Sequence, residues 1–229
     1  MARLLSLEHF KDCPIPEEDP LRLYYSPVVG RFYHRRVDVA MSLIGKGSRV
    51  LDVGFGSGTS FLELNARFDN IYGLDTHQYG GVIKEIYKRE GIDVRLSEGS
   101  ILDPPYEDNY FDAILAISIL EHLQPADLPR VMAQASRLLR PGGIFVIGMP
   151  GLNSMMSTAF RVLGYDISKH HFSSPHQALE AAGKVFEIEK TIKLPAFAPD
   201  FFLLYMWFMA RKPDAGDMLV SRADASEKN

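Results

Sequence analysis

The sequence has 229 residues, of which 46% are hydrophobic, so it can bury one substantial core and predicts a single domain. Its net charge of -4 argues against a nucleic-acid partner, because such proteins usually carry a basic surface. Cys13 is the only cysteine, which excludes an intramolecular disulfide and a cysteine-ligated metal cluster.

The amino-terminal residues, 1–23, carry three prolines among acidic side chains and predict an irregular leader that lies over the domain. From Ser26 to Ile44, apolar side chains recur every three or four residues, which predicts an amphipathic helix closed by Gly45. The domain is expected to span residues 24–212. Residues 213–229 are small, polar and charged, so we expect a disordered tail there.

Strands and helices alternate along most of the chain. The expected strands are 49–53, 71–74, 94–96, 111–117 and 144–149, and the expected helices between them are 61–68, 82–90 and 128–139. A helix at 175–182 then precedes two consecutive strands, 185–193 and 204–211, which favours an antiparallel edge pair. This order predicts an α/β fold: a Rossmann-like, seven-stranded, mostly parallel sheet with an antiparallel edge strand and helices on both faces.

The stretch from Gly54 to Gly58, here called the glycine loop, directly follows the first expected strand. The three glycines of this loop, Gly54, Gly56 and Gly58, permit positive φ and let a ligand approach the backbone N–H groups closely. A dinucleotide fingerprint needs its third glycine one position later, where this chain has Thr59. Asp52 precedes the loop at a place where it would meet a cationic ligand rather than phosphates. We therefore expect a positively charged adenosine cofactor.

Asp75 is the best single candidate for a ligand of that cofactor. It ends the second expected strand and lies 17 residues beyond Gly58, near the offset at which a carboxylate binds ribose hydroxyls in nucleotide folds. A carboxylate can accept hydrogen bonds from both vicinal hydroxyls. The alternative is an exposed cap of the next helix. Thr76, the next residue, belongs to the same candidate site.

The glycine loop and the strand before it resemble the first motif of the class I S-adenosylmethionine-dependent methyltransferases, although Phe55 stands where a small residue is common. Two later segments, Leu120 to His122 and Pro141 to Gly143, resemble the Leu-Glu-His segment and the Pro-Gly-Gly turn of that family. The resemblance covers about residues 49–148. It implies a Rossmann-like domain, S-adenosylmethionine as cofactor, and Asp75 at its ribose.

The same resemblance assigns further cofactor residues. Ser100 and Ile101 would lie against the adenine, although many members have Asp in place of the serine, and an ordinary Gly-Ser turn is the alternative. The Ile117 carbonyl would face the amine of the cofactor. His122 in such a segment more often orients a loop than transfers a proton.

The alternation of elements breaks over an insertion at about residues 150–175, on the side where such enzymes admit the acceptor. With His122, the candidates for a general base are Asp166 and His171, if the acceptor is a hydroxyl. His170 and His176 are close in sequence, but the spacing matches no established ligand pattern, so no metal is expected.

These features predict a methyltransferase that moves a methyl group to a small acceptor by in-line displacement. Apolar side chains of the insertion and of the region after it favour a partly hydrophobic, lipid- or glycan-linked acceptor; they are Met155, Met156, Phe160, Phe197, Phe201 and Phe202. Two alternatives stay open. One is a non-catalytic partner subunit that binds S-adenosylmethionine, and the other is a nicotinamide oxidoreductase, which Thr59 and the lack of a Tyr-x-x-x-Lys pattern disfavour.

Location and assembly are the last expectations. The first nine residues are interrupted by charge too early for a secretory signal, which predicts a cytoplasmic protein. The longest apolar run, Phe201 to Ala210, has ten residues, well short of the roughly 20 that a membrane-spanning helix needs. Peripheral membrane contact stays compatible with the sequence, and no oligomeric state is predicted.

Overall fold

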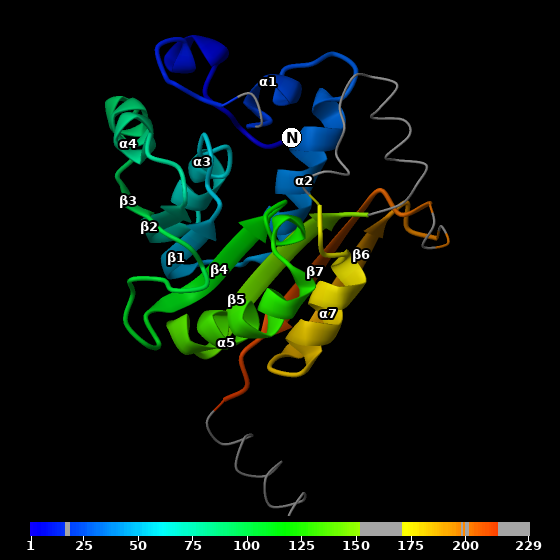
Figure 1. Cartoon of the computed structure of the whole chain (residues 1–229). Helices are drawn as coiled ribbons and strands as arrows, with labels where there is room; N and C mark the ends of the chain where they lie inside the picture. The colour runs from blue at the N-terminus through cyan, green and yellow to red at the C-terminus, as the bar shows by residue number, and fades with distance from the viewer. Residues whose placement is uncertain (17–18, 152–170, 198, 200–201, 215–229) are drawn as a thin grey trace, which may run out of the picture.

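The computed structural model describes residues 1–16, 19–151, 171–197, 199 and 202–214. Its centre is a seven-stranded sheet with the order β3–β2–β1–β4–β5–β7–β6 (Figure 1). The strands are β1 (Gly47–Val53), β2 (Phe68–Asp75), β3 (Val94–Glu98), β4 (Phe111–Ile117), β5 (Leu139–Pro150), β6 (Glu187–Leu194) and β7 (Tyr205–Arg211). Strands β1 to β5 are mutually parallel, and β7 runs antiparallel to both β5 and β6. The predicted α/β fold is confirmed, with β6 and β7 as the antiparallel edge pair.

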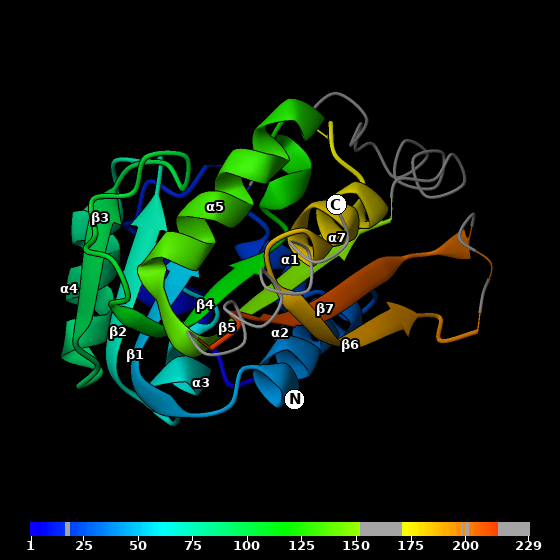
Figure 2. The same cartoon turned by 90° about the horizontal axis from the view of Figure 1, so that it is seen from below.

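Helices cover both faces of the sheet. Within the described residues they are α1 (Leu21–Tyr24), α2 (Gly30–Leu43), α3 (Phe61–Asn65), α4 (Gly80–Arg89), α5 (Leu128–Leu138) and α7 (Pro175–Gly183). Short 3-10 helices are η1 (Leu7–Phe10), η2 (Leu120–His122) and η3 (Pro125–Asp127). One hydrophobic core joins the sheet to α2, α3 and α4, and a second joins it to α5 and α7 (Figure 2). Within the described residues, no helix is long and apolar enough to cross a membrane.

The turn expected at 141–143 lies inside β5 instead. Leu139 pairs with Phe111, and Ile144 pairs with Ala113, so β5 carries extra residues between these two pairs and forms a bulge. The chain after β7 stabilises the bulge, because Lys212 N donates to Gly143 O at 2.9 Å. The predicted turn residues therefore extend the strand.

Helix α3 ends at Asn65, three residues earlier than the sequence predicts, because β2 begins at Phe68. The Phe68 side chain is only 4% exposed and belongs to the core between the sheet and α2 to α4. Burial of this ring as part of the strand outweighs the helical periodicity that includes it.

The amino-terminal segment has more structure than the irregular leader that its prolines predict. It contains η1 and α1, and it buries Ala2, Leu5 and Phe10 in the core with α2. His34 of α2 contacts the Ala2 carbonyl through Nδ1 at 3.0 Å. In Figure 1, α1 lies near the carboxyl ends of the central strands, so this segment reaches the edge of the sheet where ligands bind in such folds.

Candidate functional site

A cavity of about 370 Å³ lies at the carboxyl ends of β1, β2 and β4. Its volume falls within the range that small-molecule sites occupy. The glycine loop, α2, the amino-terminal segment and the residues after β4 all contribute to its wall. Six of the predicted cofactor residues line it: Asp52, Gly54, Gly56, Asp75, Thr76 and Ile117.

The glycine loop needs its glycines at the cavity. Gly54 has φ +70°, and a Cβ there would overlap the side chain of Ile119. Gly56 has φ +50°, and a Cβ there would lie 2.7 Å from Asp19 Oδ2. L-residues with a side chain rarely adopt such φ values, and both neighbours would also have to move.

Three predicted cofactor residues do not line the cavity. A Cβ on Gly58 would lie 2.6 Å from a Phe61 ring carbon, so this glycine allows α3 to pack closely against the loop. Ser100 Oγ accepts a hydrogen bond from Leu102 N at 3.2 Å, which is a local turn contact. Ile101 is buried in the core on the α5 side of the sheet. A cofactor role for Gly58, Ser100 and Ile101 stays a prediction.

Asp75 ties the glycine loop to the end of β2. Its Oδ2 accepts a hydrogen bond from Gly56 N at 2.8 Å, and its Oδ1 accepts one from Thr76 N at 2.7 Å. Its Oδ1 also accepts a longer hydrogen bond from His77 N at 3.4 Å. A carboxylate has about four lone-pair sites, so Asp75 can still accept a bond from a ligand in the cavity.

Asp52 lies beneath the loop and is 4% exposed. It accepts a hydrogen bond from the Ser60 hydroxyl. Ser60 is the N-cap residue of α3, but its side chain makes no capping bond and serves Asp52 instead. Burial, reinforced by the charge of Asp75, raises the pKa of Asp52 to about 7, although the bond from Ser60 acts in the opposite direction.

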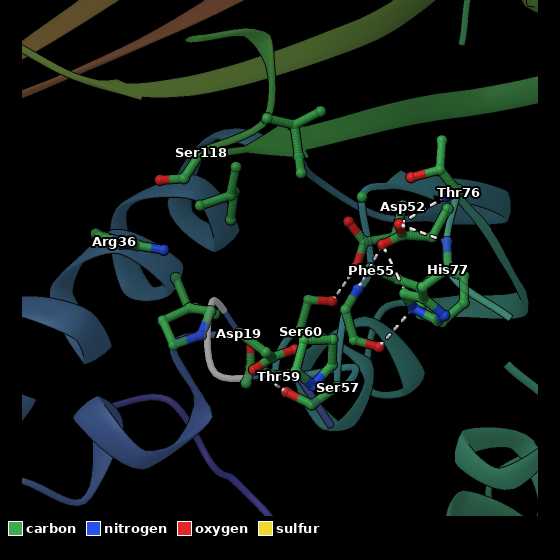
Figure 3. Close-up of a pocket in the computed structure, with 18 of the residues that line it drawn as sticks. Asp19, Arg36, Asp52, Phe55, Ser57, Thr59, Ser60, Thr76, His77 and Ser118 are labelled. Atoms are coloured by element: carbon green, nitrogen blue, oxygen red, sulfur yellow. Dashed lines mark hydrogen bonds and ion pairs between the residues drawn. The ribbon is translucent and has the colours of Figure 1, made fainter. Parts of the chain in front are cut away.

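Asp19 brings a third carboxylate to the loop from the amino-terminal segment (Figure 3). Its Oδ1 accepts hydrogen bonds from Leu21 N at 2.8 Å and from Ser57 Oγ at 3.0 Å. Burial raises the pKa of Asp19, and the charge of Asp75 acts in the same direction. Sequence reasoning missed this residue, because a proline-rich segment without periodicity gives no sign of which side chain faces the domain.

Arg36 lies across the cavity from these carboxylates (Figure 3). It is 8% exposed, with its guanidinium 4.5 Å from the centre of the Tyr33 ring. Among the described residues, its Nε has no hydrogen-bond partner. Arg36 and His34 both lie on the buried face of α2. The helical spacing offers one sign of this burial, because Arg36 lies four residues before the apolar Ala40 and therefore on the same face of the helix.

His77 is a further residue of the cavity wall that the sequence does not reveal. Its ring stacks on Tyr79 with centroids 3.5 Å apart. Its Nε2 lies 3.2 Å from Gly56 O and 3.5 Å from Asp75 Oδ2, so it supports the loop and the carboxylate together.

The residues after β4 form the remaining wall of the cavity, with Ser118 and His122 among them. Ser118 has φ +56°, and its hydroxyl shares a hydrogen bond of 2.8 Å with Tyr205 Oη. Behind them, burial raises the pKa of Glu121 to about 8 despite the nearby charge of Arg36. The residues of this wall, Ile117, Ser118, Ile119 and His122, include no carboxylate, in contrast to the glycine-loop side.

Two of the three candidates for a general base, His122 and His171, lie side by side. His122 lines the cavity, and the ring of His171 lies beside it, with centroids 5.1 Å apart. His171 is not among the lining residues. Asp166 lies outside the described residues, as does His170. Their catalytic roles stay predictions.

Residues 51–147 match the model of a family described as a methyltransferase domain. The sterol 24-C-methyltransferase erg6 of Aspergillus fumigatus is 37% identical over 106 residues, which cover 44% of this chain and 28% of that protein. The O-methyltransferase cnsE of Penicillium expansum is 33% identical over 134 residues, which cover 57% of this chain and 48% of that protein. The chain thus spans less than half the length of either relative.

A solved structure of geranyl diphosphate methyltransferase in complex with SAM has the same fold. Its TM-score with this chain is 0.67 at 19% identity, and the superposition covers 91% of this chain and 96% of that chain. At this identity the likeness concerns the fold alone. The predicted Rossmann-like fold is confirmed by this likeness, and the match over residues 51–147 agrees with the predicted family resemblance.

Proposed function

We propose that this chain, whose residues 51–147 match the model of a methyltransferase-domain family, transfers a methyl group from S-adenosylmethionine to a small-molecule acceptor. One observation carries the proposal: three carboxylates, Asp19, Asp52 and Asp75, converge on the glycine loop of the cavity. Such a charge distribution attracts a cationic cofactor and repels the pyrophosphate of a dinucleotide.

The cavity residues fit the functional groups of S-adenosylmethionine. Asp75, at the end of β2, would accept hydrogen bonds from the ribose hydroxyls. Asp52 and the Ile117 carbonyl would favour the positively charged amine and sulfonium. Arg36 is a buried cation whose Nε has no partner among the described residues, and it would bind the α-carboxylate. We call Asp52, Gly54, Gly56, Asp75 and Thr76 the donor end of the cavity.

Methyl transfer requires the protein mainly to position the reactants. The cofactor supplies an electrophilic methyl group, and transfer is an in-line displacement. The residues of this chain would hold the cofactor, align the acceptor and exclude water from the reaction. We call Ser118, Ile119 and His122, which follow β4, the acceptor end of the cavity.

The acceptor is proposed to be small and partly apolar. Of the apolar residues that suggested this, Phe197 is fully exposed and Phe202 is 39% exposed, whereas the others lie outside the described residues. The names of the relatives, which refer to a sterol and to O-methylation, and of the structural neighbour, which refers to geranyl diphosphate, agree with a small-molecule acceptor. A cytoplasmic location is part of this proposal.

Methyl transfer from the labelled cofactor to a small-molecule extract tests this function. We expect label to appear in a defined product of low molecular mass, and to disappear when an Asp75→Ala variant replaces the protein. Cofactor binding without any labelled product would instead support the alternative of a non-catalytic partner subunit. Binding of NAD in place of S-adenosylmethionine would contradict the proposal outright.

A further inference from the structure

Glu121, His122 and His171 form a compact group behind the acceptor end. Their ligand atoms, one carboxylate oxygen and two imidazole nitrogens, all lie within 4.8 Å of one another. Glu121 and His122 belong to η2, and His171 comes 49 residues later, just before α7. This distance along the chain explains why no spacing pattern in the sequence reveals the group.

Hydrogen bonds hold the two segments of this group together. Phe172 N donates to Glu121 O at 2.7 Å, and Ser173 Oγ donates to Leu123 O at 2.6 Å. Ser174 then begins α7 with a capping box, which fixes the chain directly after the group. These bonds hold the backbone of the two segments together and so help to position the three side chains.

Glu121 is the least expected member, because it is 1% exposed. Among the described residues, its Oε2 has no hydrogen-bond partner. A buried carboxyl oxygen without a hydrogen-bond partner is costly, since it has lost its hydrogen bonds to water. Arg36 stabilises the ionised carboxylate electrostatically, but it supplies no bond to this oxygen. A divalent cation on Oε2 would supply the missing partner.

The two histidines complete a donor set that selects the class of cation. Their rings meet edge to face, with an interplanar angle of 75°. Two imidazoles and one carboxylate suit the borderline transition metals and not Mg²⁺ or Ca²⁺, which prefer oxygen ligands. His122 also lines the cavity, so an ion bound here would lie next to the acceptor.

We propose that Glu121, His122 and His171 bind one divalent transition-metal ion of the Zn²⁺, Mn²⁺, Fe²⁺ or Co²⁺ class. Bonds of about 2.0–2.2 Å require the three side chains to close slightly on the ion. Three protein ligands leave at least one coordination position open. This assignment replaces the role of general base for His122 and His171 with that of metal ligands.

The open position suggests an acceptor class, and this step rests on the proposed function. A hydroxyl oxygen of the acceptor would bind the ion, which lowers the pKa of the hydroxyl so that its proton leaves to solvent. The oxygen then forms a bond to the methyl carbon while the carbon–sulfur bond breaks, and that electron pair stays on the sulfur. The acceptor is therefore an alcohol, and the product is a methyl ether.

Titration of the metal-free full chain with Co²⁺ tests the site. We expect one Co²⁺ per chain, visible as d–d absorption bands and displaced by Zn²⁺. The His171→Ala and His122→Ala variants should bind Co²⁺ at least about tenfold more weakly. His176→Ala is the matched control, because His176 is exposed on the first turn of α7 and lies outside the group. It should bind like the unaltered chain.

Absence of stoichiometric Co²⁺ binding, or unchanged binding in either folded variant, would overturn the metal site; near-ultraviolet circular dichroism identifies the folded variants. Titration of the same samples with S-adenosylhomocysteine separates this proposal from the function. If the unaltered chain binds S-adenosylhomocysteine but no Co²⁺, the metal site fails and the function stands. If it binds Co²⁺ but no S-adenosylhomocysteine, the site stands and the function fails.

Discussion

The two ends of the cavity are built from the chain in different ways. The donor end comes from one continuous stretch, from Asp52 to Thr76, in which each side chain is placed by the strand or turn that carries it. The acceptor end follows β4, and behind it lie Tyr205 of β7 and His171 before α7. Local geometry fixes the first end, and tertiary packing fixes the second. Substitutions at the two ends should therefore differ in their effects on stability and on cofactor affinity.

The largest expected effect is that of Gly54→Ala at the donor end. The new Cβ would overlap Ile119 and would force a side chain into positive φ, so we expect about 3 kcal/mol of lost unfolding free energy. Urea denaturation measures this loss. Gly81→Ala is the control, since nothing lies within 4 Å of its Cβ and its stability should stay within about 1 kcal/mol. Equal losses of unfolding free energy in both variants would show that the loop does not require glycine at position 54.

Asp75→Ala should leave the fold intact and weaken the binding of S-adenosylhomocysteine about 100-fold, because two charge-assisted hydrogen bonds to the ribose are lost. Calorimetric titration measures the change. Glu98→Ala is the matched control: Glu98 pairs with Asp75 across β2 and β3 but does not line the cavity. A loss of less than about threefold in Asp75→Ala would remove Asp75 from the ribose site.

This difference also explains what the sequence could predict. The strands were recognisable in the sequence because buried parallel strands are continuous apolar runs. The donor end was recognisable because glycine and aspartate at the ends of such strands are typical of a ligand-binding loop. Asp19 and Arg36 were missed, since their roles depend on packing between the amino-terminal segment, α2 and the loop. The bulge at Gly142 was missed because the chain after β7 stabilises it.

The pKa of Asp52, near 7, gives the donor end a pH dependence. The cationic cofactor favours the ionised carboxylate, so binding releases protons and affinity rises with pH. We expect about tenfold tighter binding of S-adenosylmethionine at pH 8 than at pH 6, levelling off above that. Calorimetric titrations in buffers of different ionisation enthalpy measure both the affinity and the number of protons released on binding. Asp52→Asn should abolish the slope, and a slope that persists in this variant would assign it to another group.

The same carboxyl affects stability with a definite sign. Its folded-state pKa lies above the ordinary value of 3.8, so the chain binds a proton on folding. The contribution of Asp52 to stability is fully present below pH 3.8 and is lost as the pH rises through 7. Asp52→Asn should therefore make the unfolding free energy less dependent on pH between 4 and 7 when no cofactor is present.

The smallest expected effect belongs to the acceptor end. Tyr205→Phe removes the hydroxyl that shares a hydrogen bond with Ser118 and should cost about 1 kcal/mol of unfolding free energy. Because Tyr205 does not line the cavity, affinity for S-adenosylhomocysteine should change by less than about twofold. A large loss of cofactor affinity would show that the two ends are coupled and that their separation is wrong.

The central claim is that the carboxylates around the glycine loop bind S-adenosylmethionine. Calorimetric titration of the unaltered chain at pH 8 with S-adenosylmethionine, S-adenosylhomocysteine and NAD tests it most directly. We predict one binding site per chain for each of the first two ligands and no heat of binding with NAD. The absence of binding with both adenosyl compounds, or tighter binding of NAD than of either, would contradict the account.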